Sequence, residues 1–129
     1  MKSRQVFSTI GGERLANFEM FRSDKKTLSI IVKEDNQTNA TLRFVACLNS
    51  EYPNGSPWII KSGTDWTLEL NTAKNVLIAT TPLEIFDTVG FFNERICLRY
   101  EIERLGTTSD PTTLEQGLLF ITPDISTNH

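Results

Sequence analysis

The chain of 129 residues contains 39% hydrophobic and 22% charged residues and carries a formal net charge of −3. This length is enough for one domain that buries a core without metal or disulfide support, and the composition excludes wholesale disorder. The acidic balance argues against a nucleic-acid partner, because nucleic-acid recognition normally uses a basic surface.

The apolar stretches are short, far below the roughly 20 residues that a membrane-spanning helix needs, so we expect no membrane partner. The N-terminal residues Met1–Gln5 include basic side chains, but no apolar segment follows them. A secretory signal would require such a segment. We therefore expect a chain that is made and kept in a cytosol.

The N-terminal 16 residues show no clear periodicity and include the pair Gly11-Gly12. We interpret residues 1–16 as an N-terminal arm or lead-in. A single β-sandwich domain is then predicted over residues 17–126.

Apolar and polar residues alternate along much of the remaining chain, as expected for half-buried strands. Leu28, Ile30 and Val32 share one face, for example, and Leu98, Tyr100 and Ile102 share another. Turn-forming residues separate these segments. The predicted strands cover residues 18–21, 27–33, 41–48, 58–61, 66–70, 76–80, 95–104 and 117–122.

One short helix is predicted to begin at Thr81. Pro82 would occupy its first position, Glu84 lies three residues after the cap, and Gly90 would end it. Seven or eight short strands with one helix indicate an all-β fold, an antiparallel β-sandwich of the immunoglobulin-like or Greek-key kind.

The two cysteines, Cys47 and Cys97, flank Trp58 in the order seen in immunoglobulin domains. The tyrosine expected two residues before the second cysteine is absent, because Arg95 occupies that position. Alternation also places Cys97 on the polar face of its strand. We therefore expect reduced thiols and no core disulfide.

Residues able to carry catalysis are scarce. The single histidine, His129, is the last residue, where a general base is poorly held. No spacing of Cys and His predicts a metal site, and no glycine motif predicts a phosphate or cofactor site. Glu101 and Glu103 share a strand face and are expected to form cross-strand ion pairs in solvent. The sequence predicts a protein that is not an enzyme and uses no cofactor.

The aromatic residues suggest contacts with other subunits. Phe91 and Phe92 are adjacent and cannot both face one side of a strand, so one of them is a candidate for a subunit interface. Phe7, Gly11 and Gly12 of the expected arm complete the candidate interface. Trp58, Trp66 and Tyr52 form an alternative, a stacking surface for sugars.

Three segments carry a resemblance to a known family. The first is the turn Arg22-Ser23-Asp24 before a long strand. The second is the expected helix start Thr81-Pro82-Leu83-Glu84. The third is the last strand and its end, from Glu115 through Thr122-Pro123-Asp124 to Ile125. Together they resemble the N-terminal domain of phage baseplate upper proteins and related short virion proteins, over about residues 17–126. Ser23 departs from the family pattern, in which glycine is commoner.

The resemblance implies a non-enzymatic virion structural protein, assembled in the host cytoplasm. Its expected role is a tail or baseplate adaptor that connects tail fibres to the tail. Its partners would be other virion proteins of the tail, baseplate, fibre or capsid, with further copies of itself in a homo-oligomer. Two alternatives remain open at this point, a capsid cement or decoration protein and a carbohydrate-binding module.

Overall fold

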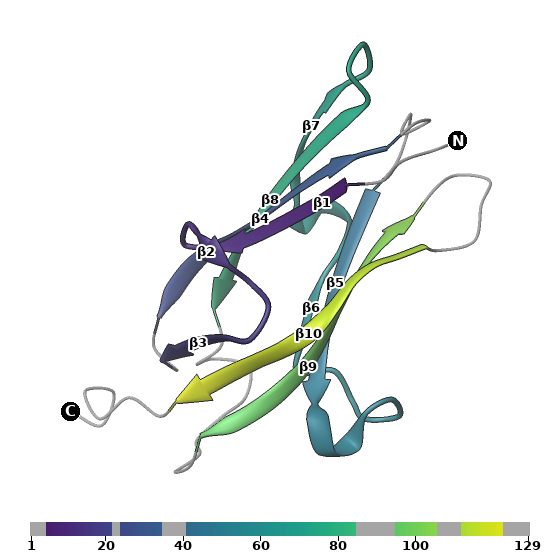
Figure 1. Cartoon of the computed structure of the whole chain (residues 1–129). Coiled ribbons are helices and arrows are strands. Elements are labelled where there is room, and N and C mark those ends of the chain that lie inside the picture. The colour runs from purple at the N-terminus through teal and green to yellow at the C-terminus, as the bar shows by residue number, and fades with distance from the viewer. Residues whose placement is uncertain (1–4, 22–23, 35–40, 85–94, 106–111, 123–129) are drawn as a thin grey trace.

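The computed structural model describes residues 5–21, 24–34, 41–84, 95–105 and 112–122. Within these ranges the chain forms ten strands and two short 3₁₀ helices (Figure 1). In chain order they are β1 (Gln5–Ile10), β2 (Glu13–Arg14), β3 (Phe18–Phe21), β4 (Lys25–Lys33), β5 (Thr41–Leu48), η1 (Asn49–Glu51), β6 (Ile59–Lys61), η2 (Gly63–Asp65), β7 (Thr67–Asn71), β8 (Val76–Glu84), β9 (Ile96–Leu105) and β10 (Thr112–Thr122).

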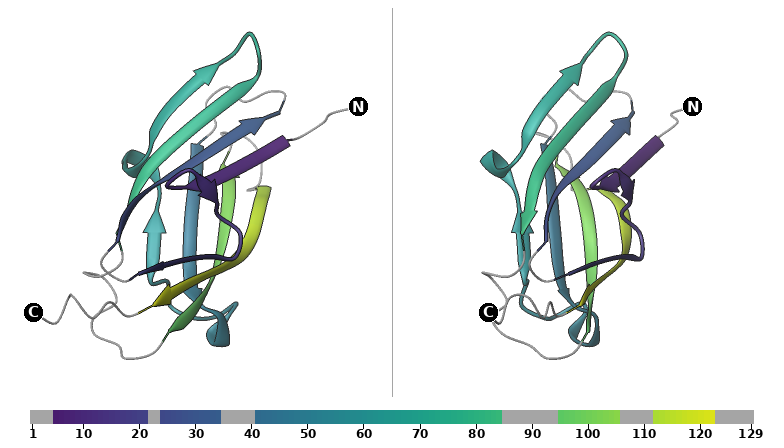
Figure 2. Two further views of the ribbon diagram at one scale, coloured as in Figure 1. Left: turned by 60° about the vertical axis from the view of Figure 1, so that its left-hand side comes forward. Right: turned by 90° about the vertical axis from the view of Figure 1, so that its left-hand side faces the viewer.

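The strands make two five-stranded sheets that pack face to face (Figures 1 and 2). Sheet A has the order β2-β1-β4-β8-β7 and its neighbouring strands are antiparallel. Sheet B has the order β3-β10-β9-β5-β6 and is antiparallel except for the parallel pair β3 and β10. The predicted β-sandwich is confirmed, with more strands than the seven or eight expected.

Side-chain alternation determines which face of each sheet is inward. Leu28, Ile30 and Val32 of β4 are fully buried, whereas Lys25 and Lys33 at its ends are exposed. In β9 the buried residues are Leu98, Tyr100 and Ile102. Successive strand residues point to opposite faces, so these inward sets meet between the sheets and the faces predicted for both strands are confirmed.

Tyr100 is the largest fully buried side chain of this core. Its ring stacks on Phe44 of β5, with 5.6 Å between ring centroids. Gly117 of β10 lies directly opposite Tyr100 in the β9–β10 pairing. A Cβ atom at position 117 would lie 2.9 Å from two ring carbons and 2.7 Å from the hydroxyl oxygen of Tyr100. Because Gly117 has no side chain, it leaves room for the Tyr100 ring.

Two of the segments that connect the sheets lie entirely within the described residues and cover the sides of the sandwich. One runs from β2 to β3 and buries Leu15 completely. The other runs from β6 through η2 to β7 and buries Trp66, whose indole Nε1–H donates to the Lys61 carbonyl at 3.0 Å. The Thr81 hydroxyl of β8 donates to the Asp65 carbonyl at 2.8 Å, which fastens this second crossing to sheet A.

The N-terminal segment differs from the expected arm. Residues Gln5–Ile10 form β1, which pairs with β4 along its whole length, and Ile10 is fully buried. The inward positions of β1 include Ser8, a buried polar residue, and this hides the alternation in the sequence. Gly11 and Gly12 have positive φ angles and make the turn into β2, where residues other than glycine are strained.

The predicted helix at Thr81 is also wrong over its first turn. Residues 81–84 continue β8 and pair with β4, where Thr81 lies opposite Leu28. β7 pairs with β8 only as far as Thr80. Pro82 therefore lies past the end of β7, where a strand residue without an N–H group is tolerated. The rest of the expected helix, residues 85–90, lies outside the described residues.

Both cysteines are free, as expected. They lie on different strands of sheet B, and Cys47 is directly opposite Arg99, whereas Cys97 is opposite Phe120. The two cysteines are thus on neighbouring strands but are not directly opposite each other.

We predict that Gly117→Ala lowers the free energy of unfolding by about 1–3 kcal/mol, because the added methyl group overpacks the Tyr100 ring. Urea denaturation followed by fluorescence measures this change. Gln116→Ala, a neighbouring exposed position on β10, is the matched control and should cost much less. Equal stability of Gly117→Ala and the wild type would contradict the assigned packing.

Candidate interaction surfaces

The outward face of sheet A carries a row of apolar side chains that spans three strands. Phe7 of β1 lies opposite Ile31 of β4, and Ile31 lies opposite Ile78 of β8. Phe7 is 50% exposed, and both isoleucines are partly exposed. We call Phe7, Ile31 and Ile78 the apolar row. It ends at Glu69 of β7, which is opposite Ile78.

A row of hydroxyl side chains runs beside the apolar row, two residues along each strand. It consists of Thr9, Ser29, Thr80 and Thr67, which are opposite one another in register. The Arg14 guanidinium of β2 lies 5.2 Å from the centre of the Phe7 ring. The apolar row is therefore flanked by polar groups, an arrangement typical of interaction patches with a polar rim.

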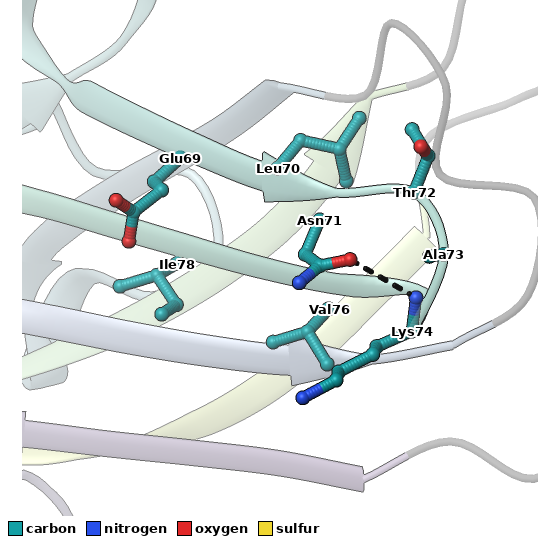
Figure 3. A pocket seen from close by; sticks show the side chains of 8 residues that line it. All are labelled: Glu69, Leu70, Asn71, Thr72, Ala73, Lys74, Val76 and Ile78. Atoms are coloured by element: carbon teal, nitrogen blue, oxygen red, sulfur yellow. Dashed lines mark hydrogen bonds between the residues drawn. The ribbon is translucent and has the colours of Figure 1, made fainter.

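The β7–β8 hairpin holds a hollow of about 580 Å³ on this side of the molecule (Figure 3). Glu69, Val76 and Ile78 line it together with residues of the hairpin turn. The Asn71 side-chain oxygen accepts a hydrogen bond from the Lys74 backbone N–H at 3.1 Å, which stabilises the turn. The hairpin extends past the other strands of the sandwich (Figures 1 and 2), so the hollow and the β7 edge are open to a partner.

The outward face of sheet B has a different character, because its charged residues are paired within the chain. Arg43 of β5 forms an ion pair with Glu103 of β9, as the sequence predicts. Glu101 accepts a hydrogen bond from the Tyr52 hydroxyl at 2.6 Å. The Arg99 guanidinium lies 4.5 Å from the centre of the Tyr52 ring. These contacts hold the loop after β5 against the sheet.

A smaller cavity of about 230 Å³ lies between this loop and sheet B, lined by Val45, Cys47, Tyr52, Pro53, Gly55, Pro57, Arg99 and Glu101. Burial, assisted by nearby carboxylates, raises the pKa of the Cys47 thiol. The hydrogen bond to Glu101 raises the pKa of Tyr52. Nucleophilic catalysis needs a thiolate, and this environment favours the neutral thiol instead.

One cluster of polar side chains lies inside the sandwich. The Ser8 hydroxyl is 2.6 Å from both carboxylate oxygens of Glu115, and the Tyr100 hydroxyl donates to Glu115 Oε2 at 2.6 Å. Burial, followed by the hydrogen bond to Glu115, raises the pKa of Tyr100 far above its usual range. Ser8 and Tyr100 are fully buried, so a substrate cannot reach them. We assign the cluster a structural role that joins the two sheets.

The candidate interface residues from the sequence are distributed as follows. Phe7 lies in the apolar row, whereas Gly11 and Gly12 form the turn between β1 and β2. Phe91 and Phe92 lie outside the described residues. The structure brings Phe7 together with Ile31 and Ile78, which sequence reasoning missed. Their signal was a run of consecutive apolar residues within an alternating strand, since such a run places some of them outward.

The positions of Trp58, Trp66 and Tyr52 do not support the alternative of a sugar-stacking surface. Trp66 is 7% exposed and belongs to the core, and Trp58 packs against the same core. Tyr52 lies on the outward side of sheet B with Arg99 against its ring. These three side chains do not form one exposed platform.

Two features are absent from the described residues. No group of three or more His, Cys, Asp or Glu side chains there could hold a metal ion. Among the same residues, we found no helix with the length and apolarity that crossing a membrane would require.

No protein-family model matches the chain, and no curated protein matches it in sequence. Among solved structures, the chain is similar to AggA, the major subunit of aggregative adherence fimbriae type I from Escherichia coli. The two share 8% sequence identity, the match covers 96% of each chain, and the TM-score is 0.45. We take no function from AggA at this level of similarity.

The predicted role as a phage tail or baseplate adaptor is nevertheless corrected here. The similar structure reported above is a fimbrial subunit, and neither a family model nor a curated protein matches the chain in support of a phage tail, baseplate or capsid role. We therefore propose neither the adaptor role nor its capsid alternative for this chain. The expected location in a virion is not tested and stays a prediction.

The raised pKa of Tyr100 predicts how stability depends on pH. The unfolded chain releases this proton near the ordinary pKa of about 10, whereas the folded protein keeps it. The free energy of unfolding should therefore fall as the pH rises above about 10. Tyr100→Phe removes this contribution, so its stability should fall less steeply in urea titrations at increasing pH.

Tyr52→Phe is the matched control, because the chain has only two tyrosines and Tyr52 lies on the outward side of sheet B. This control should retain the part of the decline that belongs to Tyr100. Parallel stability curves for Tyr100→Phe and the wild type would contradict the assignment.

Proposed function

We propose that this chain is a non-enzymatic assembly module, which binds further copies of itself through the outward side of sheet A. The observation that carries the proposal is the apolar row, which places a half-exposed phenylalanine in line with two isoleucines. Exposed apolar residues that lie together, with polar groups around them, are typical of protein–protein interfaces.

Sheet A is a better candidate for this contact than sheet B. Sheet B uses its outward charges within the chain, through the Arg43–Glu103 pair and the contacts of Glu101 and Arg99. Arg95 also lies 4.3 Å from the Phe120 ring centre and forms an ion pair with Glu19 at 2.9 Å. A partner at sheet B would have to displace these contacts. A partner at the apolar row would instead remove apolar surface from water, which favours binding.

The proposal also agrees with the chemistry of the remaining polar groups. The buried Ser8–Glu115–Tyr100 cluster has its donors and acceptors directed at one another. Burial raises the pKa of the Cys47 thiol, which disfavours the thiolate. Binding between proteins requires only a complementary surface, and we propose the outward face of sheet A as this surface.

The oligomeric state tests this proposal directly. The wild type should form oligomers in sedimentation velocity experiments over a range of concentrations. Phe7→Glu places a charge in the apolar row and should weaken association by about 2 kcal/mol, roughly a 30-fold rise in Kd. The fold should survive, because half of the Phe7 side chain is already in solvent.

Ile60→Glu is the matched control, because Ile60 is 53% exposed but belongs to β6 of sheet B. This variant should associate like the wild type. A wild type that stays monomeric at all concentrations would contradict the proposed function, as would equal weakening by both substitutions.

A further inference from the structure

Strand β7 is the longest of the four strands that end the two sheets. It has five residues, whereas β2 has two, β6 has three and β3 has four. Among the described residues, β7 pairs only with β8, which lies on one side of it. Four of its five residues are exposed, and a strand at the end of a sheet has backbone donors and acceptors on its outer edge that can pair with another strand.

Of the features that usually protect an edge strand, β7 carries one charged side chain, Glu69, and lacks the others. Its five residues include no proline and no lysine, and its pairing with β8 runs without a bulge. By contrast, the edge strand β3 has Glu19 engaged by the Thr122 hydroxyl at 3.0 Å and by Arg95. The projecting position of the β7–β8 hairpin leaves the β7 edge accessible (Figure 1).

We propose that β7 pairs in antiparallel fashion with β7 of a second copy, so that sheet A continues across a two-fold symmetric dimer. This inference rests on the proposed function, because it specifies how the assembly module meets its own copy. A two-fold contact uses the same surface on both subunits and therefore closes on itself. It also removes two exposed sheet edges at once.

The register follows from side-chain faces and from the length of the pairing. Leu68 and Leu70 are opposite the buried residues Ala79 and Leu77, so both leucines share the inward face of the hairpin. A pairing centred on Glu69 sets Leu68 against the partner's Leu70 and uses all five residues of β7. It keeps inward side chains inward, as a continuous sheet requires.

This register accounts for the exposure of the apolar side chain of Leu68, which is unfavourable in the single chain. Leu68 is 39% exposed in the single chain, and the partner's Leu70 would cover it. The same register places the two Glu69 carboxylates directly opposite each other on the outward face. Like charges in that position weaken strand pairing, so association through β7 is reversible and depends on concentration.

A cross-linking experiment tests the register on the full chain. Residues directly opposite each other in antiparallel strands have Cβ atoms about 4.5–5.5 Å apart, near the range that disulfides span. Glu69→Cys should therefore form a disulfide with its own copy under mild oxidation, seen on non-reducing gels. Mass spectrometry should place the bond between two residues 69, apart from the native Cys47 and Cys97.

Thr67→Cys is the matched control on the same strand and the same face, because the proposed register sets position 67 opposite the partner's Asn71. It should give no comparable disulfide with its own copy. Glu69→Gln removes the facing charges and should lower the Kd of the dimer about two- to fivefold. Thr67→Cys cross-linking as strongly as Glu69→Cys, or an unchanged Kd for Glu69→Gln, would overturn the register.

The outcomes separate this inference from the proposed function. If the wild type assembles and Phe7→Glu weakens it, but Glu69→Cys gives no disulfide, the β7 pairing is wrong and the assembly function stands. If the wild type is monomeric throughout and Glu69→Cys gives no disulfide, both are wrong. Specific cross-linking of Glu69→Cys together with tighter association of Glu69→Gln supports the pairing.

Discussion

The placement of the Tyr100 ring over Gly117 is the contact on which the arrangement of the two sheets depends. The ring lies on the inner face of sheet B, over Gly117 of β10, and stacks on Phe44 of β5. Its hydroxyl reaches Glu115, which also accepts the hydrogen bond from Ser8 on the opposite sheet. Unsatisfied buried polar groups are costly, so this chain of hydrogen bonds fixes how β1 lies against β10.

The position of β1 in turn determines what sheet A presents to solvent. Because Ser8 and Ile10 point inward, Phe7 must point outward, where β4 and β8 add Ile31 and Ile78 in the same line. Strand β1 therefore contributes Ser8 to the inner hydrogen-bonded cluster and Phe7 to the outer apolar row. At the opposite edge of sheet A, the hydrogen bonds of Trp66 and Thr81 hold the segment that leads from β6 into the edge strand β7.

Sequence periodicity was enough to predict the sandwich, because most strands bury one face and expose the other. It failed where a tertiary contact replaced the local signal. Ser8 occupies a core position because Glu115 binds it, and this made β1 resemble an unstructured arm. Thr81-Pro82 has the chemistry of a helix start, but the Thr81 hydroxyl binds the Asp65 carbonyl and the segment pairs with β4.

The candidate site was harder to predict than the fold, because it depends on register. Phe7 was selected as an interface residue, yet its neighbours Ile31 and Ile78 come from strands far apart in the sequence. Only the pairing of β1, β4 and β8 brings these residues into one row. The family resemblance rested on turns and strand ends, which many β-sandwiches share, and it led to a function that no family model or curated protein supports.

On this proposal, copies of the chain assemble through sheet A and its β7 edge. Amide hydrogen exchange measured at low and high protein concentration tests it most directly. The account predicts that exchange of residues 67–71 slows as the concentration rises, while exchange of residues 59–61 in the edge strand of sheet B stays the same. Exchange in β7 that is independent of concentration, in a sample shown to be oligomeric, would contradict it.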